Sequence, residues 1–211
     1  VLGHASEKCA RLGPAGGESR AASEGFFPGH VAGISPGAQQ GEMTALVTGA
    51  TGFIGSAVAR RLLARGEQVR VLARAGGDRR NLAGLAGQVK VHVADVRDWP
   101  KLPALVAGQD FLFNLVGQTS HMDSMTDPQT DLDINGRAQL AILEACRVHN
   151  PEVRIVFAST RQIYGKPDYL PVDEKHPLRP VDVNGINKIA GESFHLLYSR
   201  VHGIAATALR L

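Results

Sequence analysis

The sequence predicts an α/β protein built on a doubly wound parallel sheet. Short apolar stretches rich in β-branched residues alternate with segments whose apolar residues recur at helical spacing. A glycine-rich turn follows the first apolar stretch directly and opens into the first helical segment. Alternation of this kind indicates parallel strands in one sheet, with right-handed helical crossovers covering both faces.

The strands and helices are expected to alternate from residue 43 to the end of the sequence. The first strand, Ala45–Val47, ends at the glycine turn. The sixth strand ends the sequence and leaves almost no residues for a C-terminal substrate domain, so we expect that domain to be missing and the chain to be truncated. The other strands are expected at 68–73, 89–94, 110–115, 154–159 and 205–211, and helices at 56–65, 102–107, 130–149 and 184–202.

Residues 1–42 differ in character from the rest of the chain. They are rich in Gly, Ala, Ser and Pro, and they show neither helical nor strand periodicity. They also lack the compact apolar core of a secretory signal. We therefore expect a disordered or non-native leader, and a single folded domain at 43–211 that begins near Met43.

Composition excludes several classes of protein. No apolar stretch approaches the roughly 18 residues of a membrane-spanning helix, so we expect a soluble protein with no membrane partner. The net charge is +3, but the basic residues are dispersed, which argues against nucleic acid as a partner. Cys9 and Cys146 are the only cysteines, as in a protein of a reducing, cytoplasmic compartment. The His and Cys residues are scattered without ligand spacing, so no metal site is expected.

The glycine turn at 48–55 is the strongest functional signal. It reads T-G-A-T-G-F-I-G between a predicted strand and a predicted helix. Glycine lets the backbone approach a pyrophosphate closely, and the helix N-terminus offers free N–H donors and partial positive charge. This context favours a dinucleotide site and a Rossmann-type sheet over an ordinary turn. The turn residues expected to bind the cofactor are Gly49, Thr51, Gly52, Phe53, Ile54 and Gly55.

The end of the second predicted strand bears on the choice between NAD and NADP. An acidic residue there would bind the ribose 2′-hydroxyl of NAD, whereas an arginine accommodates the 2′-phosphate of NADP. This sequence has Ala73 followed by Arg74, which slightly favours NADP. NAD stays open as the alternative, because Asp78 lies close enough in the sequence to supply the missing carboxylate.

Five segments in order resemble the extended short-chain dehydrogenase/reductase superfamily, in particular its NAD-dependent epimerase/dehydratase (nucleotide-sugar) family. The likeness covers about residues 44 to 211. Each segment lies at the carboxyl end of a predicted strand or at the start of a helix, where open α/β sheets bind ligands. The segments are the turn at 48–55, D-V-R-D at 95–98, N-L-V-G at 114–117, S-T-R-Q-I-Y-G at 159–165 and N-G-I-N-K-I-A-G-E at 184–192.

The resemblance implies roles for residues outside the turn. Asp95 and Val96 would bind the adenine, Leu115, Val116 and Gly117 would line the nicotinamide and its ribose, and Lys188 would bind the cofactor as well. The family often has an Asn three residues before a helical Gly, and this chain has Asp133 there. Relatives form homodimers through two helices, which would be 130–149 and 184–202 here. The implied activity is epimerisation of a nucleotide sugar by transient hydride transfer to the cofactor.

The reaction centre departs from the family pattern. The family's proton-transfer residue is a Tyr four positions before a Lys, and here Asn184 stands four positions before Lys188. An amide cannot titrate near neutral pH. Thr160 takes the place of the family's catalytic Ser/Thr. The protein is therefore a silent binder, recruits another acid/base group, or uses a water held by Thr160, Asn184 and Lys188. His121 and Asp123, in a segment that resembles a substrate-proximal loop, are the candidate substitutes.

Two further functions stay open beside the epimerase. The family's dehydratases carry acidic residues directly after the Thr, but this chain has Arg161 and Gln162, which argues against elimination. An NADP-dependent carbonyl reductase is the alternative enzyme. A non-catalytic dinucleotide-binding module is the alternative from a different class, favoured by Asn184 and by the missing substrate domain.

Overall fold

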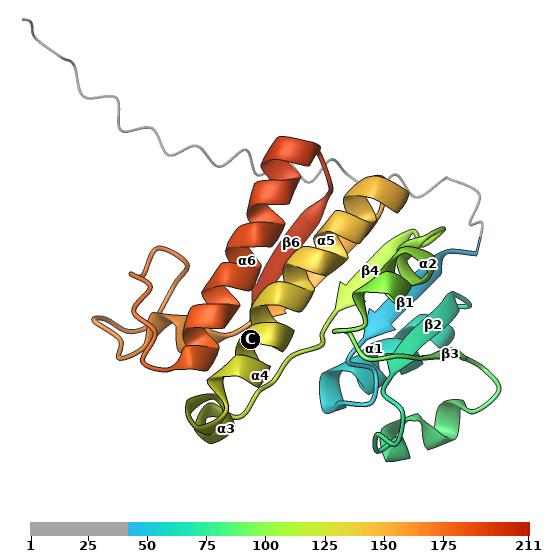
Figure 1. The fold of residues 1–211 in the computed structure, drawn as a ribbon, viewed down its shortest axis with the longest axis horizontal. Helices are drawn as coiled ribbons and strands as arrows, with labels where there is room; N and C mark the ends of the chain where they lie inside the picture. The colour runs from blue at the N-terminus through green and yellow to red at the C-terminus, as the bar shows by residue number, and fades with distance from the viewer. Residues whose placement is uncertain (1–41) are drawn as a thin grey trace, which may run out of the picture. The chain divides into compact units, whose positions relative to one another are not determined.

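A computed structural model describes residues 42–211, so that, apart from Glu42, the leader expected at 1–42 lies outside the described residues. The strands form one six-stranded sheet in the order β3-β2-β1-β4-β5-β6, and every neighbouring pair is parallel (Figure 1). This order is that of a Rossmann fold, as predicted. The strands are β1 Thr44–Thr48, β2 Gln68–Ala73, β3 Lys90–Val93, β4 Phe111–Asn114, β5 Arg154–Ser159 and β6 Ala206–Arg210.

Helices cover both faces of the sheet. The longer ones are α1 Phe53–Leu63, α5 Ala138–His149 and α6 Val183–His202. The shorter ones are α2 Leu102–Val106, α3 His121–Thr126 and α4 Pro128–Leu132, and a π-helical turn at Asp133–Arg137 joins α4 to α5. Short 3₁₀ helices lie at Arg80–Leu85, Trp99–Lys101 and Arg161–Tyr164.

Two hydrophobic clusters form the core, one on each face of the sheet. Alternate side chains of a strand point to opposite faces, so neighbouring residues of β1 enter different clusters. Leu46 packs with the cluster that includes Ile142 of α5 and Tyr198 of α6, whereas Val47 packs with Ala59 of α1. Helices α5 and α6 also pack against one another (Figure 1).

Three differences from the sequence predictions concern the elements around the glycine turn and the start of α6. Helix α1 begins at Phe53, three residues before the predicted start, because Gly52 has extended backbone and acts as its N-cap. The predicted helix 130–149 begins earlier and contains the π-helical turn. The segment expected as a substrate-proximal loop forms α3, which is short and polar and is capped by Ser120 accepting from the N–H of Asp123.

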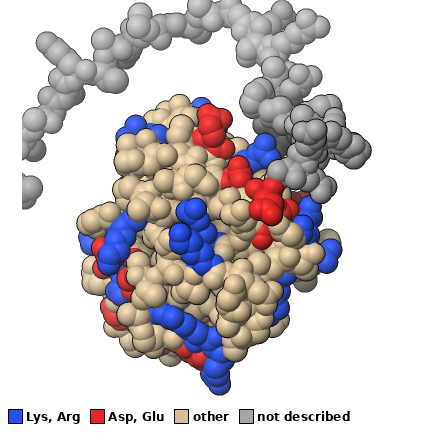
Figure 2. All heavy atoms as spheres, turned by 90° about the vertical axis from the view of Figure 1, so that its right-hand side faces the viewer, with Lys and Arg blue, Asp and Glu red and all other residues tan. Residues whose placement is uncertain are grey.

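The surface carries both charges. On the face drawn in Figure 2, the Lys and Arg side chains gather in several separate groups rather than in one patch. Within residues 42–211, every helix is too short or too polar to cross a membrane. The same part of the chain holds no group of three or more His, Cys, Asp or Glu side chains placed to bind a metal ion.

Candidate functional site

The glycine turn between β1 and α1 is fixed by close backbone contacts. Gly49 has φ +67°, and a Cβ atom added there would lie 2.5 Å from the carbonyl oxygen of Leu115, at the end of β4. A Cβ on Gly55 would collide with the carbonyl oxygen of Gly49. The sequence predicts that Gly49 lets the backbone approach a pyrophosphate closely. The structure adds a second reason for this glycine, because the turn itself packs against β4.

The N-terminus of α1 is open to an anion. Its N-cap, Gly52, has no capping side chain, and the first turn of the helix contains no acidic residue. Free N–H groups and the helix dipole at such an end favour a phosphate. Phe53 is 87% exposed and Ile54 is 46% exposed, so both are open to a ligand beside this helix end. Thr51 lies in the turn, and its carbonyl accepts from the side chain of Asn81 at 2.8 Å.

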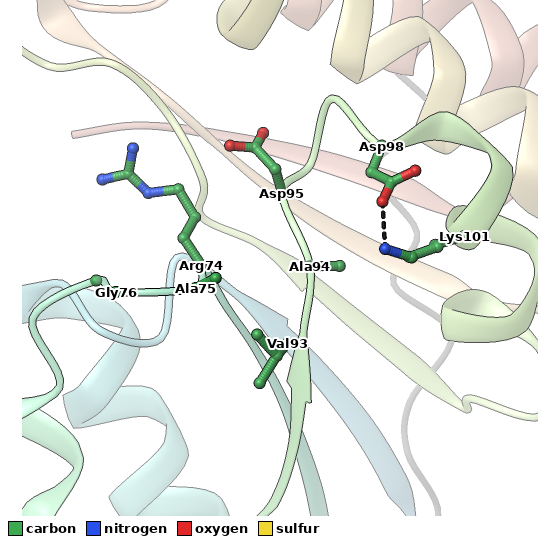
Figure 3. Close-up of a pocket in the computed structure, with 9 residues that line it drawn as sticks. Arg74, Ala75, Gly76, Val93, Ala94, Asp95, Asp98 and Lys101 are labelled. Atoms are coloured by element: carbon green, nitrogen blue, oxygen red, sulfur yellow. Dashed lines mark ion pairs between the residues drawn. The ribbon is translucent and has the colours of Figure 1, made fainter.

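A cavity of about 490 Å³ lies beyond the carboxyl ends of β2 and β3. Arg74 reaches into it from the end of β2, and Asp95 faces it from the end of β3 (Figure 3). Arg97 donates to Asp95 through Nε and Nη2, both at 2.9 Å, and this pairing lowers the pKa of the Asp95 carboxyl. Val96, the next residue, is buried in the hydrophobic core. The cavity therefore has the position and polarity expected of an adenosine site.

The end of β4 meets α6 around Gly117. The backbone N–H groups of Leu115 and Val116 donate to the hydroxyl of Thr48 at 3.1 and 3.3 Å. A Cβ on Gly117 would lie 2.8 Å from Lys188 Nζ and 3.0 Å from Asn135 Oδ1. The structure thus brings two predicted residues, Gly117 and Lys188, side by side.

Asn135 was missed by the sequence analysis. It lies in the π-helical turn, and its side chain is fully buried. Its Nδ2 donates to the carbonyl of Gln118 at 3.0 Å, but its Oδ1 has no partner within the described residues. A buried carbonyl oxygen without a donor is costly. An orphaned acceptor and an ammonium group beside a glycine fit a ligand rich in hydroxyl groups, such as the nicotinamide ribose.

Lys188 is buried and touches the end of β5. Its Nζ donates to the carbonyl of Ala158 at 3.0 Å and lies 5.2 Å from the centre of the Phe157 ring. Burial lowers the pKa of Lys188 to about 8, and the negative charge of Asp131 opposes part of this shift. Thr160 lies two residues beyond Ala158, about 7 Å further along the chain. The Thr160 hydroxyl accepts from the N–H of Gln162 at 3.2 Å.

Asn184 is engaged with the protein interior. It is 1% exposed, and its Nδ2 donates to the carbonyl of Gln118 at 2.6 Å and to Asp131 Oδ2 at 2.9 Å. Asn187 donates to the other oxygen of Asp131 at 2.8 Å. Asp131 is fully buried, and nothing in the sequence singled it out. The two amide hydrogens of Asn184 are therefore both used in holding α6 to the segment before α5.

The two candidate acid/base residues, His121 and Asp123, have different contacts. His121 begins α3, and its ring is held at the N-terminus of α6, where Nδ1 lies 2.7 Å from Asp182 Oδ2. Asp123 is exposed, and its backbone N–H caps the same helix by donating to Ser120 Oγ. His121 is thus fixed in direction by a carboxylate that the sequence analysis did not connect to it.

Known proteins resemble this chain in sequence and in fold. The model of the NAD dependent epimerase/dehydratase family matches residues 45–211. A protein of Methanocaldococcus jannaschii, provisionally named UDP-glucose 4-epimerase, is 36% identical over 169 residues, which are 78% of this chain and 54% of the relative. The chain spans about half the length of the curated relatives it matches.

Solved structures of known proteins are similar to this chain in fold. The UDP-glucose 4-epimerase of Thermus thermophilus, in complex with NAD, is 34% identical with a TM-score of 0.71, over 80% of this chain and 54% of that one. The UDP-glucose 4-epimerase of Thermotoga maritima, with UDP-glucose, is 28% identical with a TM-score of 0.73, over 80% of this chain and 55% of that one.

Proposed function

Because the chain belongs to the NAD dependent epimerase/dehydratase family, we propose that it is the cofactor-binding part of a cytoplasmic, nucleotide-sugar epimerase-like oxidoreductase. The observation that carries the proposal is the presence of three features at one edge of the sheet: the glycine turn, the cavity beside Arg74, and Gly117 with the polar groups of Asn135 and Lys188 next to it. These three features lie at the carboxyl ends of the strands, where a dinucleotide crosses an open α/β sheet.

Different residues of the site bind different parts of the cofactor. The N–H groups at the start of α1 hold the pyrophosphate, Asp95 and the backbone of Val96 face the adenine, and Arg74 faces the adenosine ribose. At the other end, Asn135 Oδ1 and Lys188 Nζ bind the hydroxyl groups of the nicotinamide ribose, next to Gly117. A bound nicotinamide supplies a reversible acceptor for a hydride from a sugar carbon. Thr160 orients the hydroxyl group on that carbon.

Either NAD or NADP is the proposed cofactor, and the side chain of Arg74 favours NADP. Arg74 is exposed at the mouth of the cavity, where a 2′-phosphate would lie. Asp78, the alternative partner for a 2′-hydroxyl, is engaged elsewhere, because Arg80 donates to it at 2.8 Å. The relatives provide the argument for NAD, since a similar structure holds NAD.

The proposed substrate is a nucleotide sugar, because the related structures and proteins carry UDP-sugar names. The occupied amide of Asn184 supports one competing function, a dinucleotide-binding module without turnover. A homodimer is also proposed. Exposed apolar side chains lie along α5 and α6, where relatives would pair: Leu140, Val148, Ile186, Leu196, Leu197 and Val201.

The proposal is tested by blocking the phosphate turn without disturbing the fold. Gly52 has an ordinary backbone conformation, and a Cβ there would meet only the carbonyl of Gly49, at 3.2 Å. Gly52→Val should therefore fold but place its side chain where the pyrophosphate approaches. We expect NAD and NADP binding by titration calorimetry to be lost, with an unchanged circular dichroism spectrum. Equal affinity in the variant and the parent would refute the dinucleotide site.

A further inference from the structure

His121 and Asp182 form a pair at the N-terminus of α6. Asp182 is the N-cap of α6, and its side chain is 3% exposed. One of its oxygens accepts from the N–H of Gly185 at 2.5 Å, and the other lies 2.7 Å from His121 Nδ1. The His121 side chain is 50% exposed. The carboxylate is therefore fixed and buried, while the far edge of the imidazole is open.

The contact determines which imidazole nitrogen carries the hydrogen. An ionised carboxylate only accepts hydrogen bonds, so Nδ1 must donate to Asp182. The negative charge of Asp182 is itself stabilised by the N-terminus of a 20-residue helix. In the neutral ring, Nε2 is then left with a free lone pair, directed away from Asp182. This is the arrangement of a general base oriented by a carboxylate.

The pair stands on the same stretch of α6 as the family's missing tyrosine. The segment after β4 runs along the start of this helix: Gly117 lies against Lys188, Gln118 accepts from Asn184, and His121 meets Asp182. Six residues of helix separate Asp182 from Lys188, which is about 9 Å along the axis. An acid/base role for His121 requires the reacting hydroxyl group to lie on the side of Lys188 that faces the start of α6.

We propose that His121 is the acid/base residue of the reaction and that Asp182 is its positioning residue. This proposal rests on the proposed function. In the oxidising direction, the O–H bond of the sugar hydroxyl breaks and its proton forms an N–H bond at Nε2. The C–H bond of the same carbon breaks, and its hydrogen leaves with both bonding electrons to an oxidised nicotinamide dinucleotide, which leaves a carbonyl group. Reversal of both transfers restores an alcohol. Asp182 stabilises the imidazolium formed in between.

Two substitutions test the pair. His121→Gln removes the base on a half-exposed surface and should not affect folding. Asp182→Asn keeps an acceptor for the Gly185 N–H, but its amide donates to Nδ1 and so moves the ring hydrogen to Nε2. Asp127→Asn is the matched control, because Asp127 also caps a helix by accepting from a backbone N–H, that of Thr130, with no histidine on it.

The first measurement is independent of turnover. Nitrogen-15 spectra of the imidazole side chains at pH 8 should show His121 with hydrogen on Nδ1 in the parent chain and in Asp127→Asn, and on Nε2 in Asp182→Asn. Addition of UDP-glucose with NAD should shift the His121 Nε2 signal. A parent ring with hydrogen on Nε2 would overturn the assignment of Asp182.

The second measurement is the reduction of bound NAD by UDP-glucose, followed at 340 nm. His121→Gln should lower the rate by about 10²-fold or more, with little change in KM, and Asp182→Asn should lower it by a smaller factor. Asp127→Asn should match the parent. If the parent reduces NAD and His121→Gln does so within threefold of it, the acid/base role fails and the proposed function stands. If NAD binds but is never reduced, the role fails in favour of the binding module. If NAD does not bind, both fail.

Discussion

The residues that follow β2 and β3 differ in exposure and pairing from those that follow β4 and β5. Beyond β2 and β3, the edge is open and charged, with Arg74 exposed and the Asp95–Arg97 pair partly so. Beyond β4 and β5, several polar side chains are buried and paired with one another, as Asp131 is with Asn184 and Asn187. The first half offers an exposed, charged surface, whereas the second is held together by buried hydrogen bonds. We therefore expect a substitution to alter cofactor affinity in the first half and to lower the free energy of unfolding in the second.

The largest effect is expected where the two halves join. Gly55→Ala places a methyl group against the carbonyl of Gly49, so the turn must move off the end of β4. We expect a loss of about 3 kcal/mol or more in the free energy of unfolding, measured by urea denaturation. Gly84→Ala is the control, because nothing lies within 4 Å of a Cβ there. Similar free energies of unfolding for the two variants would show that the turn accommodates the added methyl group, which would contradict the prediction.

The second prediction concerns the buried ammonium group. The pKa of Lys188 is about 8 in the folded chain against an ordinary value of 10.5, because burial disfavours its charge. Between these two values the unfolded chain binds more protons, so this group makes stability rise with pH across that window. The rise is worth up to about 3 kcal/mol. Lys188→Met should remove it in urea denaturation from pH 7 to 10.5, whereas the exposed Lys166→Met should keep it. Parallel pH curves for all three chains would contradict the prediction.

The next largest loss of stability is expected on removing the two amide side chains that bind Asp131. Asn184→Ala removes donors to both Asp131 and the Gln118 carbonyl, whereas Asn187→Ala removes one donor to Asp131. An unsatisfied buried acceptor costs about 1–3 kcal/mol. We expect both variants to be less stable in urea, with Asn184→Ala the worse of the two. The reverse order would mean that the bond to Gln118 contributes nothing.

The smallest effect is expected in the open half. If Arg74 binds a 2′-phosphate, Arg74→Ala should weaken NADP binding about tenfold, which corresponds to roughly 1.5 kcal/mol for one charge-assisted bond, and leave NAD unchanged. Titration calorimetry with both cofactors measures this. Arg61→Ala is the control, because Arg61 is an exposed cation in the last turn of α1, away from the cavity. Equal losses for NAD and NADP would place Arg74 outside the 2′-position.

Much of the fold could be predicted, because its signals are local. The strands at 68–73 and 154–159 have the predicted bounds, since an apolar stretch flanked by turns is legible from the sequence alone. The glycine turn likewise carries its strand and helix beside it. Helix α3 was missed because it depends on the Ser120 cap rather than on a periodic apolar face.

The candidate site was less accessible to prediction, because its contacts join residues far apart in the sequence. The partner of His121 lies 61 residues later, and the bond from Asn184 to Asp131 spans 53 residues. The role of Asn135 depends on the π-helical turn, which has no clear sequence signature. Sequence reasoning could name His121 and Asn184 as unusual, but only the packing of α6 shows what each of them touches.

The carboxylate of Asp131, which Asn184 and Asn187 share, restricts which residues can replace Asn184. A tyrosine at 184 would have to enter a site that is 1% exposed, and it would leave one oxygen of a fully buried carboxylate without its amide. Such a half-paired buried charge is costly, so the intermediate sequence would be disfavoured whatever its activity. A tyrosine at 184 would therefore need a compensating change at 131. In evolutionary terms the asparagine is entrenched by its partners, because a substitution at 184 alone leaves the buried carboxylate of Asp131 half-paired.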